Sequence, residues 1–106
     1  MEKVVLVGAA RTAMAGFQGE FSAVGAPVLG GAAIGAALEG AGVQPDLVDE
    51  LLMGCVLPAG QGQAPARQAG FAAGLGEEVP ATTLNKMCGS GMKAAMVAHD
   101  QLALGR

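Results

Sequence analysis

The sequence predicts an α/β fold in which strands and helices alternate in the order β-α-β-α-β-α. Three observations predict it: a continuously apolar, β-branched run near the start, two further short apolar runs, and a proline or glycine close to most element boundaries. Alternation of this kind implies right-handed crossovers and a parallel sheet. Any functional site is then expected at the carboxyl ends of the strands.

The first strand and helix are predicted in the first 42 residues. Val4 to Ala9 is unbroken and apolar, which is typical of a parallel strand covered on both faces. Pro27 suits the first turn of a helix, and Gly40 and Gly42 are its stop signals. Gly31 and Gly35 within that helix form a pair of small residues, which predicts close packing against another helix.

The remaining elements follow in the same alternating order. Pro45-Asp46 opens a short turn, and the later elements are expected at 50–54 (strand), 65–73 (helix), 81–84 (strand) and 89–105 (helix). The last helix is apolar on nearly all sides. A helix of this kind is normally buried between two layers.

The composition favours a part of a soluble α/β enzyme over a self-sufficient domain. Hydrophobic residues make up 52 % and charged residues 14 % of the 106 residues, with 18 glycines and neither Trp nor Tyr. Small side chains bury little area each, so we expect stability to depend on contact with further structure. The formal net charge of −3, without a basic cluster, argues against nucleic acid as a partner.

We expect a cytoplasmic protein without a membrane span. Met1 to Lys3 lacks the cationic region of a signal peptide. The uncharged stretch from Phe21 to Leu38 is interrupted by a proline and several glycines, which favours a buried helix over a transmembrane one. Without a secretory signal, Cys55 and Cys88 are expected to be reduced thiols.

Cys88 is the candidate catalytic residue. It lies between a predicted strand and the start of a predicted helix, where unpaired N–H groups and the positive end of the helix dipole stabilise a thiolate and an oxyanion. Gly89 and Gly91 leave room for a substrate carbonyl to approach the backbone. This arrangement is similar to a nucleophile elbow with sulfur in place of oxygen. A buried structural cysteine remains the alternative on local chemistry alone.

The chain also resembles the thiolases, acetyl-CoA acetyltransferases in particular. The resemblance runs from about Val4 to the end in the family's order and spacing, with small departures at Ala13 and Val28. The segments that carry it are Val5–Thr12, Gly16–Gly19, Met53–Ala69 and, around Cys88, Asn85–Ala94.

The resemblance implies a layered α-β-α-β-α fold, of which residues 1–106 would form the first part of the N-terminal domain. It implies acetyl transfer through a thioester on Cys88, whose backbone N–H would donate to the oxyanion, followed by Claisen condensation or the reverse thiolysis of a 3-ketoacyl-CoA. Coenzyme A thioesters would be substrates, and no metal or prosthetic group is required. The implied partners are the remainder of the subunit and further copies in a homodimer or homotetramer.

Three other chemically active residues receive structural interpretations. His99 follows Cys88 by eleven positions, which on one helix is ~16 Å along the axis. This is beyond the reach of a base, so His99 is predicted to be a packed or partly solvated helix residue. Cys55 is predicted to be structural. Lys86 could favour the thiolate or meet a phosphate of coenzyme A, but an exposed loop charge is the preferred interpretation.

Two other classes of function remain open from the sequence. The chain could be a non-catalytic fragment that is stable only against the rest of a subunit. It could also belong to a condensing enzyme of the ketoacyl synthase type, which uses an acyl carrier protein, although the sequence from Asn85 to Gly91 favours a thiolase. Acyl chain length, reaction direction and oligomeric state are not encoded in any recognisable pattern.

Overall fold

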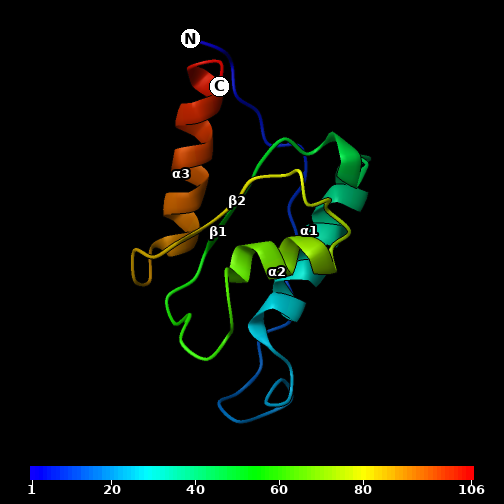
Figure 1. Ribbon diagram of the computed structural model, residues 1–106, viewed down its shortest axis with the longest axis vertical. Helices are drawn as coiled ribbons and strands as arrows, with labels where there is room; N and C mark the ends of the chain where they lie inside the picture. Colours follow the sequence, from blue (N-terminus) through cyan, green and yellow to red (C-terminus); the bar gives the residue numbers. More distant parts are fainter.

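The computed structural model describes residues 1–106 as three α-helices, one 3₁₀ turn and two strands (Figure 1). All six elements lie within a few residues of their predicted positions. Their bounds are α1 (Ala26–Ala41), η1 (Pro45–Leu47), β1 (Leu51–Gly54), α2 (Pro65–Ala72), β2 (Ala81–Leu84) and α3 (Ser90–Ala103).

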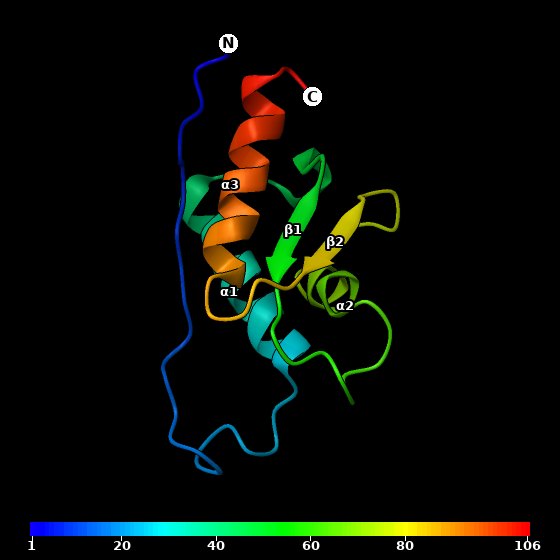
Figure 2. The same cartoon turned by 90° about the vertical axis from the view of Figure 1, so that its left-hand side faces the viewer.

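The two strands form a parallel sheet, as predicted. Leu51 lies opposite Ala81 and Gly54 opposite Leu84, and α2 makes the crossover between the strands. The Cys55 N–H donates to Leu84 O at 2.8 Å and extends the ladder by one residue beyond β1. Helix α3 covers one face of the sheet, and α1 and α2 lie on the other (Figure 2). Three layers therefore meet at the strands.

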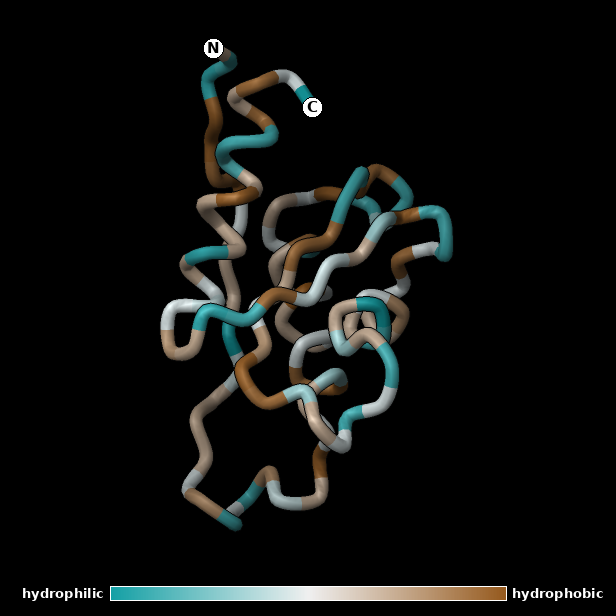
Figure 3. Tube along the Cα trace, turned by 60° about the vertical axis from the view of Figure 1, so that its left-hand side comes forward, coloured by the Kyte–Doolittle hydropathy of each residue, from teal (hydrophilic) through white to brown (hydrophobic).

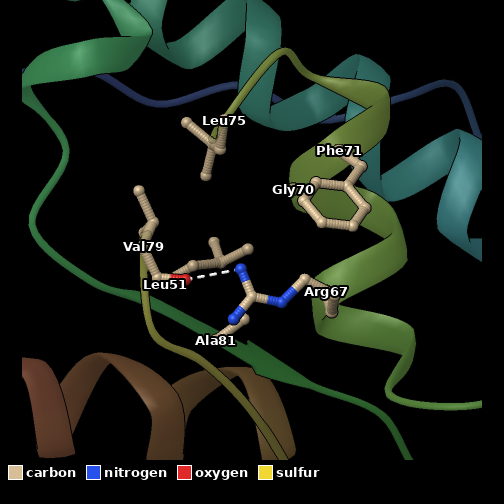
Figure 4. A pocket seen from close by; sticks show the side chains of 7 residues that line it. All are labelled: Leu51, Arg67, Gly70, Phe71, Leu75, Val79 and Ala81. Atoms are coloured by element: carbon tan, nitrogen blue, oxygen red, sulfur yellow. Dashed lines mark hydrogen bonds between the residues drawn. The ribbon is translucent and has the colours of Figure 1, made fainter. Parts of the chain in front are cut away.

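The hydrophobic core lies between α2 and the sheet. Leu51, Leu75 and Val79 form its buried centre. Arg67 reaches across this cluster from α2, donating from Nη1 to Val79 O at 2.6 Å, and its guanidinium lies 5.4 Å from the centroid of the Phe71 ring (Figure 4). This contact ties α2 to the segment that enters β2, and so fixes the helix against the strand.

Helix α1 begins where the sequence predicts and ends at the second of the two predicted stop signals, since it continues through Gly40. Pro27 lies in its first turn, and Gly42 ends it in the left-handed region at φ +68°. A Cβ on Gly31 would lie 2.5 Å from Ala72 Cβ in α2, whereas one on Gly35 would meet nothing within 4 Å. Close helix packing is confirmed for Gly31 only, because Gly35, one turn further along the same face of α1, has no neighbouring atoms where its Cβ would be.

The predicted first strand is not formed. Val4 to Ala9 is extended but unpaired and largely exposed, with Leu6 at 95 % exposure, and it runs beside α3 as an apolar segment (Figure 3). An open cavity lined by residues such as Gly8 and Leu52 separates the segment from β1. A strand requires a neighbour within hydrogen-bonding distance. The segment is attached instead by a backbone hydrogen bond just before it, from the Glu2 N–H to Ala103 O at 3.1 Å, and by close approach of Gly8 to Ala37 in α1.

Within this chain helix α3 is covered on one side only, and burial between two layers, which the sequence analysis expects through contact with further structure, stays a prediction. Ala94 and Ala103 are buried, while Met92, Met96 and Leu102 are more than half exposed. The covered side is the one that packs on β1. The opposite side is apolar but has no second layer in this chain.

The uncharged stretch from Phe21 to Leu38 is divided between a turn and α1, which starts at Ala26. No helix combines the length and the hydropathy that crossing a bilayer requires. Within α1 only Gly31 is fully buried, so the helix is partly rather than completely covered.

Candidate functional site

The candidate site lies where the two strands end. Because β1 and β2 are parallel, their carboxyl ends share one edge of the sheet, and the segments after them run side by side. The Asn85 side chain links the two segments by donating from Nδ2 to Val56 O at 3.3 Å. Cys88 follows β2 by four residues, so the predicted position at a strand end is confirmed.

A tight turn connects β2 to α3 and carries Cys88. The Gly89 N–H donates to Lys86 O at 3.0 Å, so that Met87 and Cys88 occupy the two central positions. Met87 has a φ of +47°, which is the left-handed region. Holding a residue other than glycine there costs about 1–3 kcal/mol, and such strain is concentrated at functional sites. The geometry is that of a strand, a strained turn and a helix.

The thiol of Cys88 is exposed beside free hydrogen-bond donors. The backbone N–H groups of Cys88, Gly91 and Met92 have no acceptor within the chain, and the first turn of α3 holds no acidic residue that would compete with a bound anion. A Cβ on Gly91 would meet nothing within 4 Å, so space beside the helix start is open. The arrangement suits attack by sulfur on a carbonyl whose oxygen turns towards the N–H groups.

Lys86 lies close to this turn. Its Nζ is 3.6 Å from the place where a Cβ on Gly89 would be, and its side chain is exposed. The predicted exposed position is confirmed. A role towards the thiolate or towards a phosphate stays a prediction.

Gly54 is a positioning residue that the sequence analysis did not identify. A Cβ at this last residue of β1 would lie 2.5 Å from Ser90 C and 2.6 Å from Gly91 N. Only glycine therefore lets the first turn of α3 rest directly on the strand end. A glycine at the last position of an apolar strand was the available signal, since such glycines often mark a close backbone approach.

Cys55 lies in a different environment from Cys88. Its thiol is half-buried and accepts a hydrogen bond from Gln61 Nε2 at 3.6 Å. The small cavity around it is lined by the first turns of α1 and α2, including Pro27 and Pro65. A packed thiol with a side-chain partner agrees with the structural interpretation, and both cysteines are free thiols as expected.

His99 lies on the exposed side of α3. Its side chain is 60 % exposed, and Nδ1 is 3.3 Å from Asp100 Oδ1. The prediction of a partly solvated helix residue is confirmed. It is the one histidine of the chain, so these residues contain no imidazole that could act as a base for Cys88.

Comparison with known proteins agrees with this arrangement. Residues 4–106 match the family model described as "Thiolase, N-terminal domain". The chain belongs to the thiolase family. It is 54 % identical over 105 residues to an acetyl-CoA acetyltransferase of Cupriavidus necator and 51 % identical over 105 residues to the mitochondrial acetyl-CoA acetyltransferase B of Xenopus laevis.

A solved structure confirms the thiolase-like fold. The acetyl-CoA acetyltransferase of Syntrophomonas wolfei superposes with a TM-score of 0.91 at 37 % identity, over 95 % of this chain and 26 % of that one. The two sequence relatives are covered over 99 % of this chain but only 27 % and 25 % of their own lengths. The chain therefore spans about a quarter of the thiolases that it matches.

Proposed function

We propose that this chain supplies the nucleophile of an acetyl-CoA acetyltransferase, with Cys88 as the residue that accepts the acyl group. The observation that carries the proposal is the exposed Cys88 thiol on a strained turn, next to unpaired N–H groups at the start of α3. The similarity to the named acetyltransferases supports the choice of acetyl-CoA as the acyl donor.

In the first step the Cys88 thiolate attacks the thioester carbonyl of acetyl-CoA. The carbonyl oxygen becomes an oxyanion, which the Cys88 N–H stabilises. When the tetrahedral intermediate collapses, the bond to the coenzyme A sulfur breaks and an acetyl thioester remains on Cys88. One thioester replaces another of similar energy, so this step is freely reversible.

In the second step a carbanion at the methyl carbon of another acetyl-CoA attacks the acetylated Cys88. A carbon–carbon bond forms, acetoacetyl-CoA is released and Cys88 leaves as the thiolate. The reverse sequence is thiolysis of a 3-ketoacyl-CoA by coenzyme A. Both directions need a base and an acid that move protons. His99 cannot serve as either, because it lies on the exposed side of α3 beside Asp100 and away from Cys88. We propose that the remainder of a thiolase subunit provides these groups.

The substrates are coenzyme A thioesters, and the proposed reaction uses no metal or prosthetic group. We propose assembly with the remainder of the subunit and, through it, into a homodimer or homotetramer. The exposed apolar side of α3, with Met92 and Met96, supports the need for such contacts. The cytoplasm is the proposed location. Among the relatives some are bacterial and others carry "mitochondrial" in their names.

The test is a chimera in which residues 1–106 replace the matching 27 % of the Cupriavidus necator acetyltransferase. It is incubated with acetyl-CoA labelled in the acetyl group, denatured and cleaved with trypsin. Cleavage after Lys86 and Lys93 yields a peptide with Cys88 alone, whereas Cys55 lies in the long peptide that ends at Arg67. We expect the label on the Cys88 peptide.

Two single variants make the assignment specific. Cys88→Ser should abolish the acetyl-enzyme, and Cys55→Ser should leave the labelling within about two-fold. Label on the Cys55 peptide, or turnover that survives Cys88→Ser, would contradict the assignment. Labelling that requires an acetylated carrier protein in place of acetyl-CoA would favour the ketoacyl synthase class. A chimera that folds but is never labelled would favour a non-catalytic role.

A further inference from the structure

The turn that carries Cys88 is held by two side chains in addition to its own backbone. Asn85 Oδ1 accepts the Met87 N–H at 2.9 Å. Ser90 Oγ accepts the Lys86 N–H at 2.8 Å and donates to Met87 O at 2.6 Å. Side chains from both ends of the turn thus bind the N–H and the carbonyl of Met87.

We propose that Asn85 and Ser90 are positioning residues that keep Met87 in its left-handed conformation and thereby fix the direction of the Cys88 thiol and N–H. This inference rests on the proposed function of Cys88 for its effect on catalysis. The structural part of the inference does not depend on that function. It is the set of hydrogen bonds from Asn85 and Ser90 that hold Met87, called here the clamp on Met87.

Apart from the side chains of Asn85 and Ser90, only two backbone hydrogen bonds hold the turn at Met87, from Gly89 N–H to Lys86 O at 3.0 Å and from Ser90 N–H to Met87 O at 3.1 Å. The φ of Met87 is +47°, and its side chain is 67 % exposed, so packing contributes little to its conformation. A residue with a Cβ relaxes to negative φ unless the surrounding structure prevents this. Rotation at Met87 turns the next peptide group, which contains the N–H of Cys88.

Ser90 is well placed to resist that rotation. It is only 4 % exposed, and its backbone lies against Gly54 at the end of β1. Its hydroxyl uses both its donor and an acceptor position within the turn. Removing the hydroxyl leaves the Lys86 N–H without its partner. The hydroxyl therefore couples the start of α3 to the turn.

Asn85 holds the other end of the turn. While Oδ1 binds the Met87 N–H, Nδ2 donates to Val56 O in the segment that follows β1. One amide side chain thus fixes the turn relative to the neighbouring strand end. Because Asn85 is exposed, its replacement should disturb the turn without opening the core.

The chemistry requires this precision because nucleophile and oxyanion donor belong to the same residue. The sulfur must reach the carbonyl carbon while the Cys88 N–H points to the carbonyl oxygen. A misplacement of ~1 Å can reduce the rate about 10²-fold. A looser turn should therefore slow acylation more than it weakens substrate binding.

The test compares Ser90→Ala, Asn85→Leu and Asn85→Asp in the chimera. Asp keeps the acceptor for the Met87 N–H and Leu does not. We expect the rate of Cys88 acetylation to fall about 10- to 100-fold in Ser90→Ala and Asn85→Leu, with KM for acetyl-CoA within two-fold. Asn85→Asp should be faster than Asn85→Leu, because it keeps the acceptor for the Met87 N–H although it loses the donor to Val56 O. Amide hydrogen exchange at Lys86 and Met87 should become faster in the two defective variants.

Thr83→Val is the matched control. Thr83 Oγ1 also accepts a backbone N–H, that of Ala66 at 2.9 Å, but it lies outside the turn. Its removal should change acetylation less than two-fold. The proposal is overturned if Ser90→Ala and Asn85→Leu acetylate at the unsubstituted rate, or if Thr83→Val is equally slow. If the unsubstituted chimera is not acetylated, the proposed function fails, and unchanged exchange at Met87 would then overturn the clamp separately.

Discussion

Replacing Gly54 with alanine should displace the start of α3 and slow acetylation of Cys88. The new Cβ would lie 2.5 Å from Ser90 C, 2.6 Å from Gly91 N and 2.7 Å from Ser90 O. Ordinary carbon contacts are ~3.5–4.0 Å, so the helix start must move by about 1 Å away from β1. All three atoms belong to the backbone, so no side chain can rotate out of the way.

The expected size of the effect follows from that displacement. Overpacking costs typically about 1–3 kcal/mol, and contact with backbone places Gly54→Ala in the upper half of this range. A shift of ~1 Å at the nucleophile corresponds to a rate loss of about 10²-fold. The measurements are the thermal midpoint of the chimera and its single-turnover acetylation by labelled acetyl-CoA.

Gly35→Ala is the control for this substitution. Gly35 is also a glycine in a regular element, but a Cβ there meets nothing within 4 Å. In a helix interior alanine is more stable than glycine by roughly 0.5–1 kcal/mol, so this variant should be slightly stabilised and fully active. Acetylation of Gly54→Ala within two-fold of the unsubstituted rate would refute the claim that the strand end sets the position of α3.

Three further predictions concern stability and self-sufficiency. Gly31→Ala should destabilise the chimera by about 1–3 kcal/mol, measured by its thermal midpoint, because its Cβ would lie 2.5 Å from Ala72 Cβ; an unchanged midpoint would show that α1 and α2 separate freely. The chain alone should show no thiolase turnover in a steady-state assay, because it contains no base near Cys88; activity that disappears in Cys88→Ala would contradict this. Light scattering with size exclusion should show the isolated chain as an aggregate, a disordered monomer or a complex, since Leu6 and Met92 are exposed; a folded, cooperatively unfolding monomer would refute it.

The elements that sequence predicted correctly are those specified by local chemistry. Pro27 and Gly42 mark the ends of α1 because proline suits a first helical turn and glycine adopts positive φ without strain. The position of Cys88 after β2 follows from the same kind of signal, a short strand followed by glycines. These preferences act over a few residues and need no tertiary partner.

The first strand was predicted wrongly because it depends on a partner strand. The run from Val4 to Ala9 has the composition of a buried strand, but a strand forms only beside another strand, and a cavity separates it from β1. Helix α3 also has apolar residues on both sides, and within this chain only the side facing β1 is covered. The prediction that further structure covers the other side is therefore not tested by these residues. The composition of a segment indicates whether it suits a buried or an exposed position. It does not show whether the partner that would bury it is present.

The sequence by itself determined the α/β class, the parallel sheet, the placement of Cys88 at the start of a helix and the resemblance to the thiolases, because these follow from short-range periodicity, turn residues and motif spacing. Only the tertiary structure decided the left-handed turn at Met87, the hydrogen bonds of Asn85 and Ser90 that hold it, and the contact of Gly54 with α3. Each of these depends on backbone atoms brought within a few ångströms by the packing of β1, β2 and α3, and the distances between such atoms cannot be obtained from residue types alone.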